Sequence, residues 1–250
     1  MSIALKGKEP QARLFASQAL SAAVLAEAKS IDWISSGNGG RMRSLRAAFQ
    51  DLRQFLWAFV GMNLVYFGVL LSAMLFVVFH RQTQQALLSS VTSAFQTTPI
   101  GEAYAGGHLA SAILMTFAVN LIAGSLLYIT LPSLVVPFSG ICLGLVRAAV
   151  WGVMFSPQSA PGNASGWVLG ALTGLLVLLE GEGYVLAMLG SYVQGWTLLH
   201  PREAGADTRG NAYLLGARRS LRMYWLVAAQ LAVAAIYEVL LVIVIRPHLV

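Results

Sequence analysis

The chain has 250 residues, of which 57% are hydrophobic and only 10% charged, and its formal net charge is +6. A soluble globular domain carries about 25% charged residues, and the mean hydropathy here is +0.70. So much apolar surface would aggregate in water. The composition therefore excludes a soluble, disordered, coiled-coil or disulfide-stapled protein and predicts an all-α integral membrane protein whose partner is the lipid bilayer. The one cysteine, Cys142, forms no intrachain disulfide and, with four scattered histidines, predicts no metal site.

Residues 1–53 are expected to form a helical, amphipathic region that precedes the membrane domain at 54–250. Apolar residues fall on one helical face between Leu20 and Ile34. An alternative is a signal peptide with Ala26-Glu27-Ala28 as its cleavage site. The glycine-rich stretch 35–40 predicts a flexible joint.

The segment after that joint alternates apolar and basic residues. Leu45, Phe49 and Leu52 are interleaved with arginines such as Arg46 and Arg53. This pattern predicts a basic amphipathic helix that lies on an anionic membrane surface before the first span begins.

About five apolar runs are long enough, or nearly so, to cross about 30 Å of hydrocarbon as helices. They cover residues 56–79, 109–131, 133–155, 166–199 and 224–245. The fourth run is interrupted by Glu180-Gly181-Glu182-Gly183. Because two glycines weaken a helix there by about 1 kcal/mol each, we expect this segment to be broken or re-entrant.

Two prolines, Pro132 and Pro137, flank a short connection between the second and third runs. Proline ends helices, so the two runs are expected to form a tight hairpin of antiparallel neighbours. Gly140 and Gly144 have the four-residue spacing that permits close helix approach in membranes.

The distribution of Lys and Arg predicts the orientation of the chain. Eight of the sixteen basic residues precede the first run and five lie in 200–223, whereas 80–108 and 156–165 together hold only Arg81. This places the N-terminus and a basic loop at 200–223 in the cytoplasm, and residues 80–108 outside. The basic excess is explained by topology, so nucleic-acid binding is not expected.

Polar side chains inside the apolar runs are the candidate functional residues, because each ionisable group costs roughly 2.5 to 3.5 kcal/mol at a helix centre. The candidates are Asn120, Arg147, Glu180, Glu182 and Glu238. Arg147 and Glu238 each lie fourteen residues from the inner end of their runs. An Arg147–Glu238 pair at one depth is therefore predicted first, with Glu180 as the alternative partner.

The Glu180–Gly183 segment admits two interpretations. Carboxylates at a helix break are typical of the midplane sites of transporters. A plain re-entrant turn that reaches water explains the same residues. For helix packing, Gly181 and Gly183 join Gly140 and Gly144 as candidate close-contact positions.

No catalytic constellation is evident, so the chain is not expected to be an enzyme and no cofactor is predicted. The four histidines lie outside or at the edges of the apolar runs. Gly162-Asn163-Ala164-Ser165-Gly166 differs by one position from the Gly-x-Ser-Gly pattern of intramembrane serine proteases.

Between about residues 56 and 222 the chain resembles the stage II sporulation protein M-like family of integral membrane proteins. The resemblance rests on Phe117-x-x-Asn120, Gly140-x-x-x-Gly144, Glu180-Gly181-x-x-Tyr184-x-x-Ala187 and Arg218-Arg219-Ser220-Leu221-Arg222. The family pattern at the third motif is His-Gly-x-x-Glu-x-x-Ala, so Glu180 and Tyr184 replace its His and Glu. The resemblance implies a five-span inner-membrane protein. Any role of the family's His or Glu does not transfer to these positions.

Two functions follow as expectations. The first is a non-enzymatic membrane scaffold that anchors envelope proteins, with a homo-oligomer possible. The second is a small-solute or ion transporter or channel subunit that uses Arg147, Glu180, Glu182 and Glu238. A water-accessible cavity reaching these groups would favour transport, and groups sealed between helices would favour the scaffold.

Overall fold

The computed structural model describes residues 37–156 and 164–249, and in this part of the chain the regular structure is entirely helical. The chain divides into two compact units, Met1–Ser44 and Leu45–Val250. Only the last residues of the first unit are described, so the fold below is that of Leu45–Val250. The amphipathic helix expected within residues 20–34 lies outside the described residues.

Helix α2 (Gly37–Gln54) leads into α3 (Leu56–Phe79), the first long apolar helix. The bounds of α3 match the predicted first run. The flexible joint predicted at 35–40 is wrong for residues 37–40, because these belong to α2. On α2, Ala48 is fully buried, whereas Leu45 and Phe49 stay 38% and 48% exposed. The predicted apolar face is therefore open at Leu45 and Phe49, whereas Leu52 is partly buried against the core.

Two short helices, α4 (Arg81–Gln96) and α5 (Pro99–Ala105), connect α3 to the next span. The Thr98 hydroxyl caps α5 by accepting from the Gly101 backbone N–H at 3.2 Å. Pro99 opens this helix, where its missing N–H costs nothing.

The second span contains an unusual helical stretch. Helix α6 (Leu109–Ala118) continues as a π-helix, η1 (Val119–Thr130), and then as α7 (Leu131–Val135). The buried residues of η1 are Asn120, Gly124, Ser125, Ile129 and Thr130. Their spacing of four to five residues follows the wider π turn, in which each N–H bonds five residues back. Contrary to expectation the helix continues through Pro132, and the connection to the next helix begins at Val136.

Helix α8 (Ser139–Met154) packs along α3 in the same direction, and α9 (Ala164–Leu199) runs back beside it. The predicted break or re-entrant turn in the fourth run is wrong, because α9 is one continuous helix of 36 residues. Gly181 and Gly183 have a different role. A methyl group on Gly181 would lie 2.9 Å from the Phe67 ring, and one on Gly183 would lie 2.5 Å from the Leu231 side chain. Because they lack a side chain, these glycines allow α3 and α10 to pack close to α9.

Helix α10 (Arg209–Val239) extends through η3 (Leu240–Ile245) to the short η4 (Arg246–His248). It begins at residue 209, fifteen residues before the predicted fifth run at 224–245. The basic segment predicted as a loop at 200–223 is therefore mostly helix, and only 200–208 connects α9 to α10. The Thr208 hydroxyl caps the helix by accepting from the Asn211 N–H at 3.2 Å.

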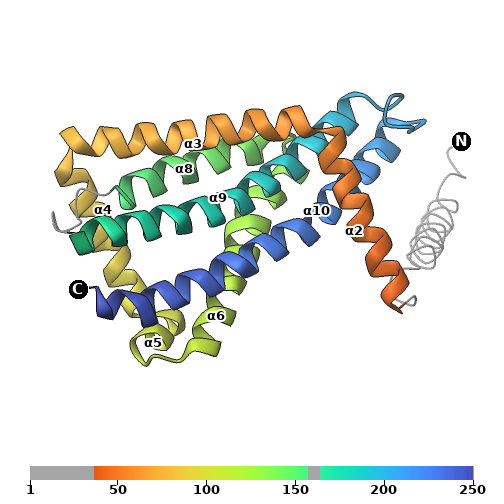
Figure 1. Ribbon diagram of the computed structural model, residues 1–250. Coiled ribbons are helices and arrows are strands. Elements are labelled where there is room, and N and C mark those ends of the chain that lie inside the picture. The colour runs from red at the N-terminus through yellow and green to blue at the C-terminus, as the bar shows by residue number, and fades with distance from the viewer. Residues whose placement is uncertain (1–36, 157–163, 250) are drawn as a thin grey trace, which may run out of the picture. The chain divides into compact units, whose positions relative to one another are not determined.

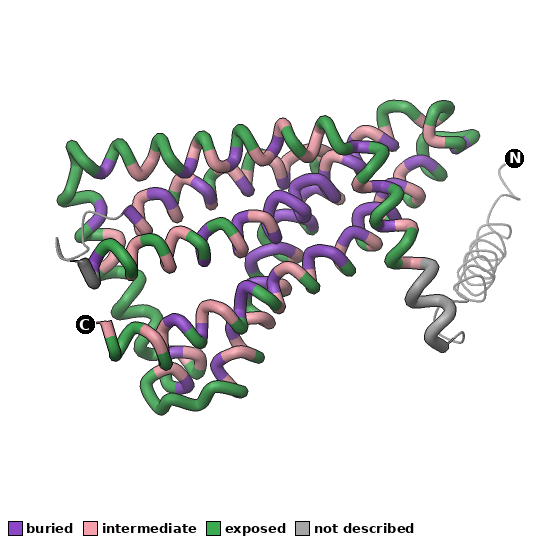
Figure 2. The backbone as a smooth tube through the Cα atoms, in the orientation of Figure 1, coloured by how far each residue is buried: buried purple, intermediate pink, exposed green. Residues whose placement is uncertain are grey.

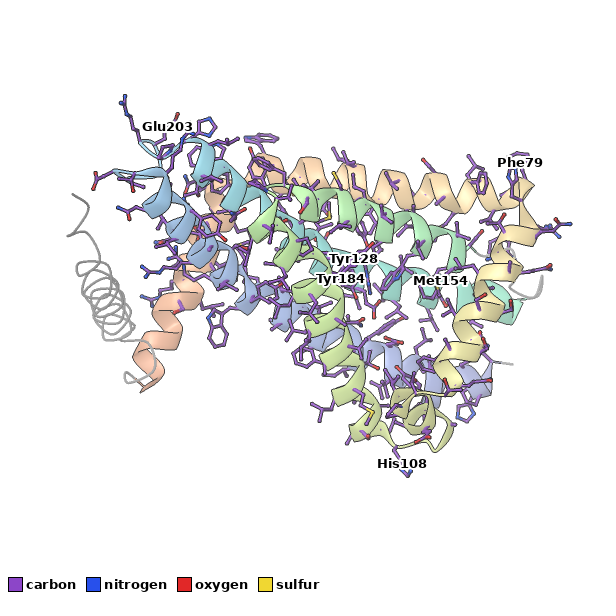
Figure 3. The ribbon with its side chains drawn as sticks, turned by 180° about the vertical axis from the view of Figure 1, so that it is seen from behind. Phe79, His108, Tyr128, Met154, Tyr184 and Glu203 are labelled. Carbon is purple, nitrogen blue, oxygen red and sulfur yellow. The ribbon has the colours of Figure 1, made fainter. Side chains whose placement is uncertain are left out.

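Phe79 and Met154 lie toward one end of the bundle and Glu203 lies at the other (Figure 3). We call these the α4 end and the α9–α10 loop end. Figure 1 shows α3 and α8 running toward the α4 end and α9 running back, while α10 diverges from α9 as it approaches that end. Within residues 37–156 and 164–249, four helices are long and apolar enough to cross a membrane, and α8 is a shorter apolar helix.

Burial is concentrated on α9 near the loop end, as Figure 2 shows. From Tyr184 to Leu189 every residue of α9 is buried, and Met223, Val227 and Leu231 of α10 pack in the same core. Large apolar residues elsewhere face outward, including Trp57 at 86% and Leu64 at 72% exposure on α3. This outward apolar surface is what lipid contact requires.

Candidate functional site

Arg147 of α8 is held between aromatic rings inside the bundle. Its guanidinium lies 4.0 Å from the centre of the Tyr184 ring and 4.8 Å from that of Trp151. The two rings meet edge to face, with their centres 5.3 Å apart. Cation–π contacts of this kind contribute about 2 kcal/mol when desolvated. They compensate part of the cost of keeping a cation among apolar helices.

A directed chain of hydrogen bonds starts at Arg147. Its Nη2 donates to the Tyr184 hydroxyl at 2.6 Å. Tyr184 donates to the Asn120 Oδ1 at 2.9 Å, and the Asn120 Nδ2 donates to the Glu180 Oε1 at 2.9 Å. Arginine only donates, so the Tyr184 hydroxyl accepts from it and keeps its own proton to donate to the Asn120 oxygen. The Asn120 amide nitrogen is a donor, so the Glu180 Oε1 is an acceptor.

The acidic end of this chain contains two carboxyl groups. Glu180 is 4% exposed, and its carboxyl group interacts with the neighbouring carboxyl group of Glu238, a half-buried residue of α10. Glu238 in turn interacts with the hydroxyl of Tyr104 on α5. Tyr104 also lies 2.9 Å from the Thr116 Oγ1 on α6. We call the set from Arg147 to Thr116 the polar network.

Tyr104 lies in the connection outside the long apolar helices. Burial raises the pKa of its hydroxyl, and the neighbouring Glu238 carboxylate raises it further. The hydroxyl therefore keeps its proton and can donate to Glu238. If it does so, Thr116 is the donor in the bond between the two hydroxyls.

The predicted site residues are thus brought together only in part. Asn120, Arg147, Glu180 and Glu238 belong to the polar network, but the predicted Arg147–Glu238 ion pair is wrong. In the described part of the chain no ion pair joins these two side chains, because Tyr184 and Asn120 stand between Arg147 and the carboxyl groups. Glu182 lies apart, half-buried and beside Asn63 on α3.

The glycines singled out in the sequence lie at helix contacts. A methyl group on Gly144 would clash with the Met188 side chain, and one on Gly140 would lie 2.5 Å from the Ser133 hydroxyl. Gly124, another small residue of the predicted hairpin, lies against the polar network. A methyl group there would lie 3.1 Å from the Tyr184 ring and 3.2 Å from the Arg147 guanidinium.

Tyr66 of α3 was also missed, although it is fully buried beside the polar network. Its hydroxyl has no hydrogen-bond partner, and it interacts electrostatically with Arg147 and Glu180. A tyrosine in an apolar run gives no sequence signal, because the ring alone explains its presence there.

A second charged cluster joins α2 to α10. Arg219, 8% exposed, donates from Nε to the Asp51 Oδ1 at 2.8 Å and from Nη2 to the Gln54 side chain. Arg222 lies 3.6 Å from the other Asp51 oxygen. The guanidinium of Arg219 also lies 5.4 Å from the centre of the Phe55 ring. We call these residues the Asp51 cluster.

An apolar groove of about 430 Å³ lies between α3 and α9, toward the α4 end. Its lining includes Phe67, Leu71, Met74, Ala171 and Gly174. It contains none of the polar network. Among the described residues, no group of three or more His, Cys, Asp or Glu side chains could hold a metal ion.

A search of family models, curated proteins and solved structures finds no match to the chain.

Proposed function

We propose that the chain is a non-enzymatic, multi-pass protein of the cell membrane that anchors other envelope proteins, as the resemblance to the stage II sporulation protein M-like family implies. The proposal includes five crossings, with α8 as the third, and a cytoplasmic α9–α10 loop. In this arrangement the α4 end lies outside, in agreement with the near absence of Lys and Arg from 80–108 and 156–165.

The observation that carries the proposal is the location of the ionisable groups. Glu180 is buried between helices and is hydrogen-bonded by Asn120, and Arg147 is covered by Tyr184 and Trp151. The groove described above is lined by apolar side chains and does not reach them. Polar groups that bond one another between helices support a rigid bundle.

The α3–α9 groove supports lateral contact with a partner. Gly174 on α9 lines the groove and has open space beside its α-carbon. Small residues on a membrane helix let another helix approach closely. We propose that a membrane helix of an envelope protein packs in this groove.

Site-specific photo-crosslinking in native membranes tests this proposal. A photoreactive amino acid at Gly174 should give a discrete crosslinked protein band, which mass spectrometry then identifies. The matched control is Leu114 of α6, a lipid-facing position 67% exposed and outside the groove. Crosslinks to protein from Leu114 but not from Gly174 would count against the groove, and lipid adducts at both positions would count against a scaffold.

A transporter or channel subunit is the second candidate, and one observation favours it. The polar network runs without interruption from Arg147 on α8, through Glu180 and Glu238, to Tyr104 outside the long apolar helices. Purified protein in liposomes with an internal pH dye tests this function. Dissipation of an imposed pH gradient that Glu180→Gln abolishes would favour transport, and a rate equal to that of empty liposomes would exclude proton conduction.

A further inference from the structure

Two neighbouring carboxyl groups among apolar helices, the buried Glu180 and the half-buried Glu238, face a charge problem. If both Glu180 and Glu238 were ionised, the polar network would carry two negative charges against the single positive charge of Arg147. An uncompensated charge in this environment costs several kcal/mol. One proton shared between the carboxyl groups removes the excess, because the pair then carries one negative charge and balances Arg147.

The neighbouring donors agree with this count. On one side, the chain that begins at Arg147 ends with Asn120 donating to the Glu180 Oε1. On the other side, the Tyr104 hydroxyl interacts with Glu238 and is the donor available to it. Each carboxyl group therefore has a donor outside the pair, and neither of these donors bridges the two carboxyl groups. Two carboxyl groups can hydrogen-bond only if one supplies a proton.

We propose that Glu180 and Glu238 form a proton-binding site, in which one exchangeable proton is held between the two carboxyl groups at the interface of α9 and α10. The proposal concerns binding and does not depend on anchoring or on transport. A metal cation is disfavoured as the occupant, because the Asn120 Nδ2, which points at the Glu180 Oε1, is a donor and cannot ligate a cation.

Tyr66 provides an observation outside the pair that points to an exchangeable proton. It is fully buried, its hydroxyl has no partner, and it lies close enough to Glu180 to interact electrostatically. An unpartnered buried hydroxyl is costly. It can donate to Glu180 when the shared proton leaves and the pair needs another donor.

The other groups that face the pair are few. Arg147 on α8 and Tyr184 on α9 act on Glu180 from the side of Asn120, and Tyr66 acts from α3. Tyr104 on α5 faces Glu238, with Thr116 on α6 behind it. Since the tyrosines remain neutral donors and arginine keeps its charge, the pair itself is where the proton is gained or lost.

Infrared spectroscopy of the purified protein in lipid tests the proposal, because a protonated carboxyl group has a C=O stretching band that a carboxylate lacks. At neutral pH the wild type should show this band. Glu180→Gln and Glu238→Gln should each abolish it, since the remaining carboxylate alone balances Arg147. All variants carry Glu182→Gln as a common background, because Glu182 is a second half-buried carboxyl group on α9, and this background should still show the band of the pair.

A pH titration of the band measures the pH at which the site loses its proton. Tyr104→Phe removes a donor to the ionised pair, so the site should keep its proton to a pH higher by about one to two units. Tyr66→Phe should shift the midpoint in the same direction. If both Gln variants fail to fold, as judged by circular dichroism and gel filtration, an unchanged midpoint in Tyr104→Phe still overturns the proposal.

Three further results would overturn it. The first is no protonated-carboxyl band in the wild type at neutral pH. The second is a band that persists unchanged in both Gln variants. The third is loss of the band when Na⁺ replaces K⁺ at constant pH, which would identify a metal cation as the occupant.

Discussion

The two charged regions of the bundle differ in how an arginine is connected to its nearest carboxyl group. In the Asp51 cluster, Arg219 binds a carboxylate directly, at 2.7 Å between its Nη2 and the Asp51 Oδ1. In the polar network, Arg147 reaches a carboxyl group only through Tyr184 and Asn120. Both guanidiniums stack on aromatic rings, so the difference lies in the anion.

The number of carboxyl groups explains this difference. Asp51 is a single carboxylate between two arginines, and it pairs with them directly. Glu180 and Glu238 are two carboxyl groups serving one arginine, and neutral groups between them and Arg147 spread the interaction over three helices. A direct pair stabilises one contact, whereas the relayed arrangement couples α8, η1 and α9 and makes each link depend on the next.

The largest expected effect comes from breaking the direct pair. Asp51→Leu should lower the free energy of unfolding by about 3 to 5 kcal/mol, because it leaves Arg219 buried without its carboxylate. The double variant Asp51→Leu, Arg219→Met should recover much of that loss. Unfolding by SDS titration in mixed micelles measures all three variants. Strictly additive losses would show that the pair does not couple α2 to α10.

A smaller loss of stability is expected from breaking the relay, by which we mean the chain of hydrogen bonds from Arg147 through Tyr184 and Asn120 to Glu180. Tyr184→Phe should lower the free energy of unfolding by about 2 to 3 kcal/mol, because it removes a bond to a charged donor and leaves the Asn120 Oδ1 unpaired. Tyr224→Phe is a matched control, since it loses one neutral bond to Thr130 and should cost about 1 kcal/mol. Equal losses in the same SDS titration would contradict a charge-assisted relay.

A smaller effect is expected from crowding the relay. Gly124→Ala should lower the free energy of unfolding by about 1 kcal/mol, because its methyl group would press on the Tyr184 ring and the Arg147 guanidinium. Gly68→Ala, which has open space, should be neutral or slightly stabilising. Thermal unfolding in one detergent compares the two variants, and indistinguishable melting temperatures would show that the relay tolerates displacement.

The smallest effect belongs to Arg222, whose side chain is 36% exposed and lies 3.6 Å from Asp51. Arg222→Ala should lower the free energy of unfolding by less than about 1 kcal/mol, and the difference should shrink as salt is added. Thermal unfolding at low and high salt checks this. A loss comparable to that of Asp51→Leu would mean that Arg222, rather than Arg219, is the main partner.

The sequence was sufficient to predict the fold class and most of the apolar helices. Length and hydropathy gave α3 its bounds and α9 its bounds within two residues. The continuity of α9 was not predictable, because Glu180-Gly181-Glu182-Gly183 has the local composition of a break. Tertiary contacts explain why the helix continues through this segment. Neighbouring side chains pack against the glycines, and Asn120 donates a hydrogen bond to the Glu180 carboxyl group.

The members of the candidate site were partly predictable and their pairing was not. Ionisable residues in apolar runs are conspicuous, so Arg147, Glu180 and Glu238 were found. Equal depth suggested the wrong pair, since depth along a helix says nothing about which helices touch or which neutral side chains stand between them. Tyr184 was noted only as a departure from a family pattern.

The π-helix η1 gives the second span a tolerance that its neighbours lack. Removing one residue from an ordinary helix turns everything beyond it by about 100° and shortens it by about 1.5 Å. In α9 such a deletion between Glu180 and Tyr184 would separate the two side chains that meet Asn120. In η1 each wide turn already holds one residue more than an α-helical turn. A deletion within Val119–Thr130, beyond Asn120, can be absorbed there as a wide turn tightens, so this span can change in length while its ends keep their places.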